Sequence, residues 1–344
     1  MKTGLFIALA LASKCSAHAS LKQTANRAVR LLLLPCIVLL CFCCETSAQG
    51  VAEPLFTLKQ IGPKVWAAIS NRAANTGFVI GDDGVVVIDT TASVDADGNF
   101  SLEHGKQLLA AIRKLTNFPV KFVINTHYHV DHVGANSVFV DAGATVLAHR
   151  NVRDWIHSEN LRMFGNDIKP QHKSFIDALL PPTVTYDQAV DLYLGSREIR
   201  VRSFPGHTGG DSIVLIPDAS VVFAGDLFWR NMLPNMIDAS TKPWIATLET
   251  LATNAGYVFV PGHGDLGTVQ DVAAFREYLV TLQKLVSESR AQGKTGASLT
   301  QAVVPALVGK YGQWEGFNFA EPSILQMDAE LGGRKRIPEA QPVR

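Results

Sequence analysis

Three histidines and one aspartate gather within six positions of this sequence. His127, His129, Asp131 and His132 follow directly after the apolar run 120–125, which has the composition of a buried strand. Imidazole nitrogens and carboxylate oxygens bind zinc in proteins, and a catalytic zinc site leaves one coordination position for water. A polar turn with hydrogen-bonded histidines is the simpler interpretation, but the density of the four residues favours a metal site at the end of a strand.

Three more potential ligands stand alone further along the chain. His207 lies in the stretch Pro-Gly-His-Thr, Asp226 in Gly-Asp and His263 in Gly-His-Gly, and each comes after an apolar run. The neighbouring glycines allow a sharp backbone turn where the side chain must reach the edge of a sheet. All five cysteines fall within the first 44 residues, so a metal site in the rest of the chain must use His, Asp or Glu.

The elements that must position these residues are strands and helices in alternation. Apolar runs bounded by turn residues predict strands at residues 65–69, 76–80, 85–89, 120–125, 145–148, 198–204, 212–216, 220–224 and 257–260. A helical period predicts helices at residues 105–115 and 244–253 and a mostly helical stretch over 269–309. Residues 158–188 contain three prolines, and we expect a loop with a short helix, either overhanging a pocket or crossing the surface.

The motif series His-x-His-x-Asp-His, Pro-Gly-His-Thr, Gly-Asp and Gly-His-Gly resembles that of the metallo-β-lactamase superfamily over roughly residues 55–278. The resemblance implies an α+β fold, a four-layer αββα sandwich with metals in a cleft at one edge of two sheets. It further implies two Zn²⁺ ions, one held by His127, His129 and His207 and the other by Asp131, His132 and His263, with Asp226 bridging both. In such a site a metal-bound hydroxide attacks a substrate carbonyl, and Asp131 could orient it.

Single positions separate this chain from relatives that share the fold. Flavodiiron-type oxidoreductases carry a carboxylate where His129 stands, so this histidine favours zinc and hydrolysis. Persulfide dioxygenases, which use one iron, resemble the series more closely and stay an alternative. A catalytically silent binding protein on the same fold is a further alternative, and it would be marked by the loss of a ligand, whereas all seven are present.

The expected substrate is a small molecule with a β-lactam or lactone-like carbonyl. The best-known β-lactamases have Cys or Ser in place of Asp226, and one group has a lysine where this chain has Trp229, so Asp226 looks instead like the glyoxalase II, lactonase and general-hydrolase branches. We expect Phe164, Trp229 and Arg230 to bind the substrate, with Arg230 as the cation for a carboxylate. Candidates for hydrogen bonds to ligand imidazoles, with turn or capping roles as the alternative, are Asp89, Thr208, Asp211 and Asp265.

The N-terminus has the pattern of a targeting sequence. Arg27 and Arg30 precede the apolar run 31–44, and a small-residue cleavage site lies before Gln49. We therefore expect an exported protein, periplasmic or secreted, with an uncleaved, membrane-anchoring leader as the alternative.

Charge and length complete the expected organisation. Cleavage before Gln49 would remove five basic residues and one acidic residue from a balance of 31 and 31, leaving an acidic protein without the clustered basic face that nucleic acid requires. Contact with a membrane is expected only through an uncleaved leader. The predicted division is a signal region at 1–48, a metallo-β-lactamase-fold domain at 49–285, and a helical C-terminal extension with a loose tail at 286–344.

Overall fold

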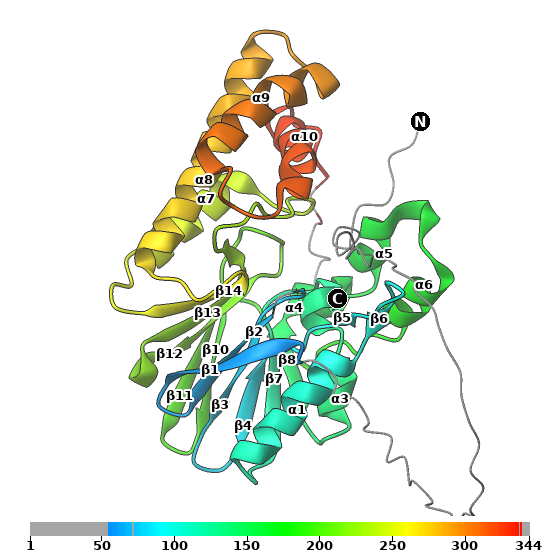
Figure 1. Cartoon of the computed structure of the whole chain (residues 1–344). Coiled ribbons are helices and arrows are strands. Elements are labelled where there is room, and N and C mark those ends of the chain that lie inside the picture. The colour runs from blue at the N-terminus through cyan, green and yellow to red at the C-terminus, as the bar shows by residue number, and fades with distance from the viewer. Residues whose placement is uncertain (1–53, 71, 337, 339–344) are drawn as a thin grey trace, which may run out of the picture. The chain divides into compact units, whose positions relative to one another are not determined.

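Two β-sheets face each other in the computed structural model, which describes residues 54–70, 72–336 and 338 (Figure 1). The first sheet has the strand order β1-β2-β3-β4-β7-β8-β9. Its strands are β1 (Phe56–Gly62), β2 (Val65–Ser70), β3 (Thr76–Ile80), β4 (Val85–Ile88), β7 (Val120–Asn125), β8 (Thr145–His149) and β9 (Val184–Tyr186). β1 to β4 are antiparallel neighbours, whereas β4, β7, β8 and β9 run parallel. The carboxyl ends of β4, β7 and β8 therefore meet at one edge.

The second sheet has the order β10-β11-β12-β13-β14. Its strands are β10 (Ala189–Leu194), β11 (Arg197–Ser203), β12 (Ser212–Ile216), β13 (Val221–Trp229) and β14 (Val258–His263), and a separate ribbon joins β5 (Ser93–Val94) to β6 (Phe100–Ser101). Only β13 and β14 run parallel in the second sheet, and their register places Trp229 opposite His263 at the carboxyl ends.

The described part of the chain contains ten helices, some of which cover the outer faces of the two sheets. They are α1 (Glu103–Leu115), α2 (Val130–Val133), α3 (Asn136–Val140), α4 (Arg150–Trp155), α5 (Ser158–Phe164), α6 (Pro170–Asp177), α7 (Thr241–Leu251), α8 (Val269–Ala291), α9 (Gly296–Tyr311) and α10 (Ala320–Leu331), with 3₁₀ turns η1 (Gly165–Asp167), η2 (Pro217–Ala219) and η3 (Phe317–Phe319). Leu108 of α1 and Phe139 of α3 pack on the first sheet, and Trp244 of α7 and Phe275 of α8 pack on the second. The expected α+β, four-layer αββα order is confirmed.

The space between the sheets holds a third apolar cluster. Ile69, Val86 and Ile124 of the first sheet meet Val201 and Phe223 of the second, and all five side chains are buried. These residues come from the runs predicted as strands, whose alternate side chains face inward because the side-chain direction repeats every two residues. The packing of the two sheets on each other brings the edges that carry the candidate ligands together.

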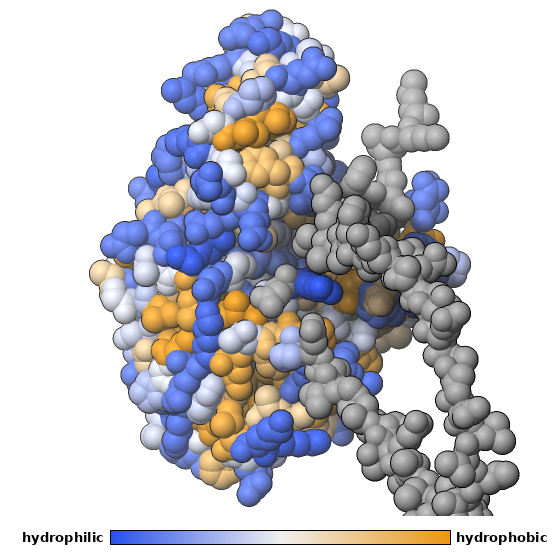
Figure 2. Space-filling view, viewed as in Figure 1, coloured by the Kyte–Doolittle hydropathy of each residue, from blue (hydrophilic) through white to orange (hydrophobic). Residues whose placement is uncertain are grey.

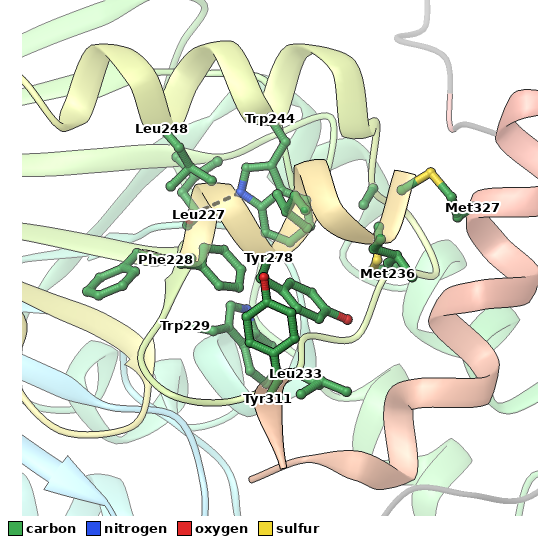
Figure 3. Close-up of a cluster of buried hydrophobic side chains, with 14 of the residues drawn as sticks. Leu227, Phe228, Trp229, Leu233, Met236, Trp244, Leu248, Tyr278, Tyr311 and Met327 are labelled. Atoms are coloured by element: carbon green, nitrogen blue, oxygen red, sulfur yellow. Dashed lines mark hydrogen bonds between the residues drawn. The ribbon is translucent and has the colours of Figure 1, made fainter. Parts of the chain in front are cut away.

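The C-terminal helices extend the apolar cluster that covers the second sheet. Trp229, Tyr278, Tyr311 and Met327 belong to it, and the indole of Trp244 donates a hydrogen bond to the carbonyl of Leu227 at 2.9 Å (Figure 3). Hydrophilic residues lie over much of the outer surface of these helices (Figure 2). The expected domain boundary at residue 285 falls inside α8. This helix continues without a break from the part that packs on the second sheet into the expected C-terminal extension.

Residues 158–188 contain more secondary structure than the sequence predicts. The segment 158–188, expected as a loop with a short helix, contains the two helices α5 and α6 and the strand β9. Pro170 is compatible with α6 because it stands in the first turn, where its missing N–H costs no hydrogen bond. The predicted leader, residues 1–48, lies outside the described residues. Among those described, no helix combines the length and the apolar character needed to cross a membrane.

Gly77 of β3 lies close against Phe223 of the second sheet, and its substitution should be costly. A Cβ atom there would lie 2.2 Å from the ring of Phe223 and 2.6 Å from the carbonyl oxygen of Trp66. We expect Gly77→Ala to lower the free energy of unfolding by about 3 kcal/mol, measured by urea denaturation, because the sheets must separate to admit the methyl group. Gly309→Ala in α9, where a Cβ meets no atom within 4 Å, is the matched control and should change stability by less than about 1 kcal/mol. Equal losses in both variants would contradict the close-approach argument.

Candidate metal centre

The carboxyl end of β7 leads directly into the ligand-rich loop. After Asn125 the chain passes through buried Thr126 and His127 to His129, which is the N-cap residue of α2. Asp89, just after β4, accepts hydrogen bonds from the backbone N and the Oγ1 of Thr126, both at 2.8 Å. The two neighbouring parallel strands therefore hold the start of this loop in place.

The first group of candidate ligands consists of His127, His129, His207 and Asp226, whose ligand atoms lie within 4.8 Å of one another. His207 comes from the loop between β11 and β12, and Asp226 comes from β13. The Nε2 atom of His207 lies 3.0 Å from Nδ1 of His129 and 3.1 Å from Oδ2 of Asp226. All four side chains are buried, and they join residues of both sheets.

The second group consists of Asp131, His132 and His263. Nε2 of His263 lies 3.2 Å from Oδ2 of Asp131, and Nε2 of His132 lies 3.9 Å from the same oxygen. The side chain of His132 is fully buried, whereas that of Asp131 is 36% exposed. The second group is therefore open to solvent on the side of Asp131.

Asp226 connects the two groups through its two carboxylate oxygens. Oδ2 faces the first group, 3.1 Å from His207 Nε2 and 3.8 Å from His127 Nε2. Oδ1 faces the second group, 3.0 Å from His132 Nε2 and 3.5 Å from His263 Nε2. A carboxylate in this position can serve one ion with each oxygen.

The glycine before His263 makes room for this carboxylate. A Cβ atom on Gly262 would lie 1.9 Å from Oδ1 of Asp226, so the position excludes every larger residue for reasons of space. The side-chain amide of Asn75 donates to the carbonyls of Pro261 and Gly264 at 2.9 and 2.8 Å, which fixes the turn that carries His263. The glycine was expected to supply backbone freedom, and the structure gives it a steric role as well.

Two buried aspartates each contact a candidate ligand imidazole at the ring nitrogen that points away from the ligand groups. Asp89 Oδ2 lies 2.9 Å from Nδ1 of His132, as expected from the sequence. Asp238 was not expected: its Oδ2 lies 3.3 Å from Nε2 of His129 and accepts a hydrogen bond from the hydroxyl of Tyr128 at 2.8 Å. Such partners fix the tautomer and the ring orientation of a metal-binding histidine, leaving Nε2 of His132 and Nδ1 of His129 to face the ligand groups.

Burial and the surrounding carboxylates set the charges of the site. Burial, reinforced by the neighbouring His132, holds the pKa of His127 well below its usual range, so this imidazole is neutral. Burial by itself lowers the pKa of His132, but the carboxylates of Asp226, Asp89 and Asp131 outweigh it and raise that pKa well above its usual range. Burial likewise raises the pKa of Asp226, but the adjacent imidazoles outweigh this effect and hold it well below its usual value.

The donor set fits divalent metal ions. Nε2 of His127, His132 and His263 and Oδ1 of Asp226 are buried and have no hydrogen-bond partner within the described part of the chain. A buried polar atom without a partner is costly, and four such atoms converge on one place. Imidazole and carboxylate ligands suit zinc, and the two groups can hold an ion each.

The three expected substrate-binding residues occupy different surroundings. Trp229 is 3% exposed and stacks on His263 with ring centroids 4.1 Å apart, so it supports a candidate ligand rather than lining an open surface. Nε of Arg230 lies 3.2 Å from Oδ1 of Asp271 at the start of α8. Phe164 packs edge-on against Phe100 at 5.8 Å, in the cluster beside α6.

The other three residues that were expected to bond to ligand imidazoles contact other groups instead. Thr208 and Asp211 bond to each other, since Asp211 accepts from the backbone N of Thr208 at 2.7 Å and from its hydroxyl at 2.5 Å. Burial raises the pKa of Asp211 to about 7. Asp265 pairs at the surface with Lys59 at 2.6 Å. The pair Thr208 and Asp211 shapes the loop after His207, and Asp265 belongs to the surface.

Comparison with known proteins places this geometry in a family. The model of the Metallo-beta-lactamase superfamily matches residues 70–263. A linear primary-alkylsulfatase from a Pseudomonas species is 23% identical over 217 residues, which are 53% of this chain and 40% of that protein. A type 2 metallo-beta-lactamase from Pseudomonas aeruginosa is 21% identical over 236 residues, 67% of this chain and 87% of that protein.

A solved structure supports the same assignment at the level of the fold. The metallo-beta-lactamase from Pontibacter korlensis has a TM-score of 0.54 and 23% sequence identity, and the match covers 65% of this chain and 98% of that one. The family match covers more than half of the chain and includes all seven candidate ligands. The chain belongs to the metallo-beta-lactamase superfamily.

Proposed function

We propose that this protein is a zinc-dependent hydrolase that cleaves a small carbonyl compound, with a β-lactam or a lactone as the substrate class. The observation that carries the proposal is Asp226, which turns one carboxylate oxygen toward each of two donor groups. Seven nitrogen and oxygen ligands with one shared carboxylate suit two zinc ions. The similarity to a metallo-beta-lactamase along 87% of that protein supports the choice of a carbonyl substrate.

When bound, a pair of zinc ions supplies a polarised carbonyl and a water acidic enough to react near neutral pH. The residues of the chain hold that arrangement in place. Asp226 would bridge the ions, and Asp89 and Asp238 keep the imidazoles of His132 and His129 turned toward them. Asp131 is the proposed catalytic carboxylate, because it is partly exposed, stays ionised at neutral pH and can accept a hydrogen bond from the attacking water.

Metal analysis of the purified protein, combined with a substrate panel, tests the proposal. We expect close to two zinc ions per chain and hydrolysis of a lactam or a lactone in preference to a phosphodiester or a sulfate ester. One tightly bound iron without zinc would favour a persulfide-dioxygenase-like oxidoreductase instead. Two bound zinc ions without turnover of any compound in the panel would favour a catalytically silent binding protein.

We propose that Arg230 binds the carboxylate of the substrate. Its side chain is 29% exposed and its guanidinium also pairs with Asp271, so Arg230→Ala tests whether Arg230 binds the substrate or supports the structure. If Arg230 binds the substrate, KM for a carboxylate-bearing lactam rises about tenfold in the variant, because the substrate carboxylate loses its charged contact. KM for a neutral lactone then stays the same. Steady-state kinetics on both substrates measure this. An equal change on both substrates would assign Arg230 to the support of α8.

We also propose that the protein is exported, with a mature N-terminus near Gln49. The support is the sequence pattern of the first 48 residues. Cell fractionation with N-terminal mass analysis tests this, and material that retains Met1 in the cytosol would refute it.

A further inference from the structure

The segment after α10 returns to the loop that carries Asp238. The ammonium group of Lys335 donates hydrogen bonds to the carbonyls of Met236 and Ala239, which lie on either side of Asp238 in the sequence. The side chain of Lys335 is 2% exposed. A buried lysine is costly unless its donors are satisfied, and here two of them are used to hold one short loop.

Arg336 is connected to the same aspartate through the side chains of Glu159 and Arg162. Its guanidinium binds both oxygens of Glu159 on α5, at 2.8 and 2.9 Å. Glu159 also accepts from Nε of Arg162 at 2.5 Å, and Arg162 donates through its other end to Oδ1 of Asp238. Bidentate pairs of this kind fix orientation as well as charge. We call Lys335 and Arg336 the C-terminal clamp.

The carboxylate held in this way faces a candidate ligand. Oδ1 of Asp238 accepts from Arg162, which leaves Oδ2 for Tyr128 and for Nε2 of His129. The opposite nitrogen of the same ring, Nδ1, lies 3.0 Å from Nε2 of His207 in the first ligand group. A displacement of Asp238 would therefore rotate or shift one of the three imidazoles of that group.

We propose that the C-terminal clamp positions Asp238, and through it His129, so that two residues beyond α10 set the affinity of the three-histidine group for its metal. This inference rests on the proposed function, because it requires that the group binds a metal ion. Lys335 and Arg336 are positioning residues, since each acts through an intermediate group. A partner that binds a ligand imidazole directly is typically worth about 10- to 100-fold in metal affinity. The clamp acts on that partner through the carbonyls of Met236 and Ala239 or through Glu159 and Arg162, so it should be worth less, about 3- to 10-fold.

The test measures Zn²⁺ affinity by chelator competition in the full-length protein and in the variants Arg336→Gln and Lys335→Met. The His263→Ala background, which lacks a ligand of the second group, identifies the binding step that belongs to the three-histidine group. We expect a 3- to 10-fold weaker step in both clamp variants and an altered visible absorption spectrum after Co²⁺ substitution. Arg336→Lys keeps the charge but loses the bidentate geometry, so it should restore part of the affinity.

Arg334→Gln is the matched control, because Arg334 belongs to the same segment but pairs with Asp328 of α10. It should leave the affinity within about twofold of the parent. A double-mutant cycle tests the route: in an Asp238→Asn background, Arg336→Gln should have little further effect, because coupled residues are not additive. Lys335→Met removes a buried group, so if it fails to fold, the exposed Arg336 carries the test.

The outcomes separate the two proposals. If the parent protein binds no metal, the proposed function fails together with this inference. If the parent binds zinc but Arg336→Gln behaves like Arg334→Gln, the inference alone is overturned. The same holds if the effect of Arg336→Gln persists unchanged without the carboxylate of Asp238.

Discussion

Replacement of Asp226 by alanine should abolish most of the hydrolytic activity and remove one of two bound metal ions. The carboxylate faces both donor groups, and its Oδ1 lies 3.0 Å from Nε2 of His132 and 3.5 Å from Nε2 of His263. The second group would keep one carboxylate and two imidazoles, whereas the first would keep its three histidines, so the remaining ion should occupy the first group. Because each zinc contributes several kcal/mol to transition-state stabilisation, kcat/KM should fall on the order of 10³-fold.

Kinetics and metal analysis of three variants check this expectation. His127→Ala removes a ligand of the first group only, so its residual metal should differ from that of Asp226→Ala. Asp265→Ala is the control, since this aspartate lies two positions after His263 but pairs with Lys59 at the surface. Its kcat/KM should stay within about twofold of the parent, as is usual for a solvent-exposed ion pair. Retention of two ions by Asp226→Ala would contradict the bridging role.

Removal of the metal should destabilise the fold strongly. The site buries the carboxylates of Asp89 and Asp226 together with several imidazoles. The Nε2 atoms of three of the ligand imidazoles and one oxygen of Asp226 have no hydrogen-bond partner among the described residues. At free zinc about 1,000 times above Kd, each bound ion adds about 4 kcal/mol to the free energy of unfolding. For a domain of this size, loss of that amount lowers the melting temperature by on the order of 10 °C.

Thermal denaturation with and without a chelator measures the effect. The chelator should lower the melting temperature of the parent more than that of His263→Ala, because that variant has already lost a ligand of the second group. Restoration of zinc should recover the melting temperature of the parent. Identical melting curves in chelator and in zinc would show that the converging donors do not bind a metal under these conditions.

The grouping of the candidate ligands was predictable because they follow buried strands in recognisable local patterns. His127, His129, Asp131 and His132 lie within six positions just after β7, and His207, Asp226 and His263 each stand beside glycine. Asp89 was also within reach, since it directly follows β4, the parallel neighbour of β7. The strands themselves follow from apolar runs, and their alternation with helices indicates helices packed outside a sheet, whereas the four layers were implied by the resemblance to the metallo-β-lactamase superfamily.

Asp238 and the C-terminal clamp could not be found in the same way. Asp238 is 109 positions from His129 and lies in a loop between β13 and α7, with no motif around it. Arg336 is 177 positions from Glu159, and both are charged residues that would ordinarily face solvent. Contacts of this kind depend on where loops travel over the finished fold. Residues 158–188 illustrate the same limit, since Pro170 in the first turn of α6 and the pair Pro181 and Pro182 further along resembled the prolines of a loop.

The two sheets contribute different members of each ligand group, and this division has a consequence for how the protein matures. His129 and His207 are 78 positions apart, and no single strand pair or hairpin contains a complete group. Long-range pairings form late because loop closure must come first. A nascent chain that has made only its first sheet therefore has no finished site with which to capture a metal ion. Acquisition of the ion should follow the docking of the sheets, so metal uptake during refolding would report the completion of the tertiary structure.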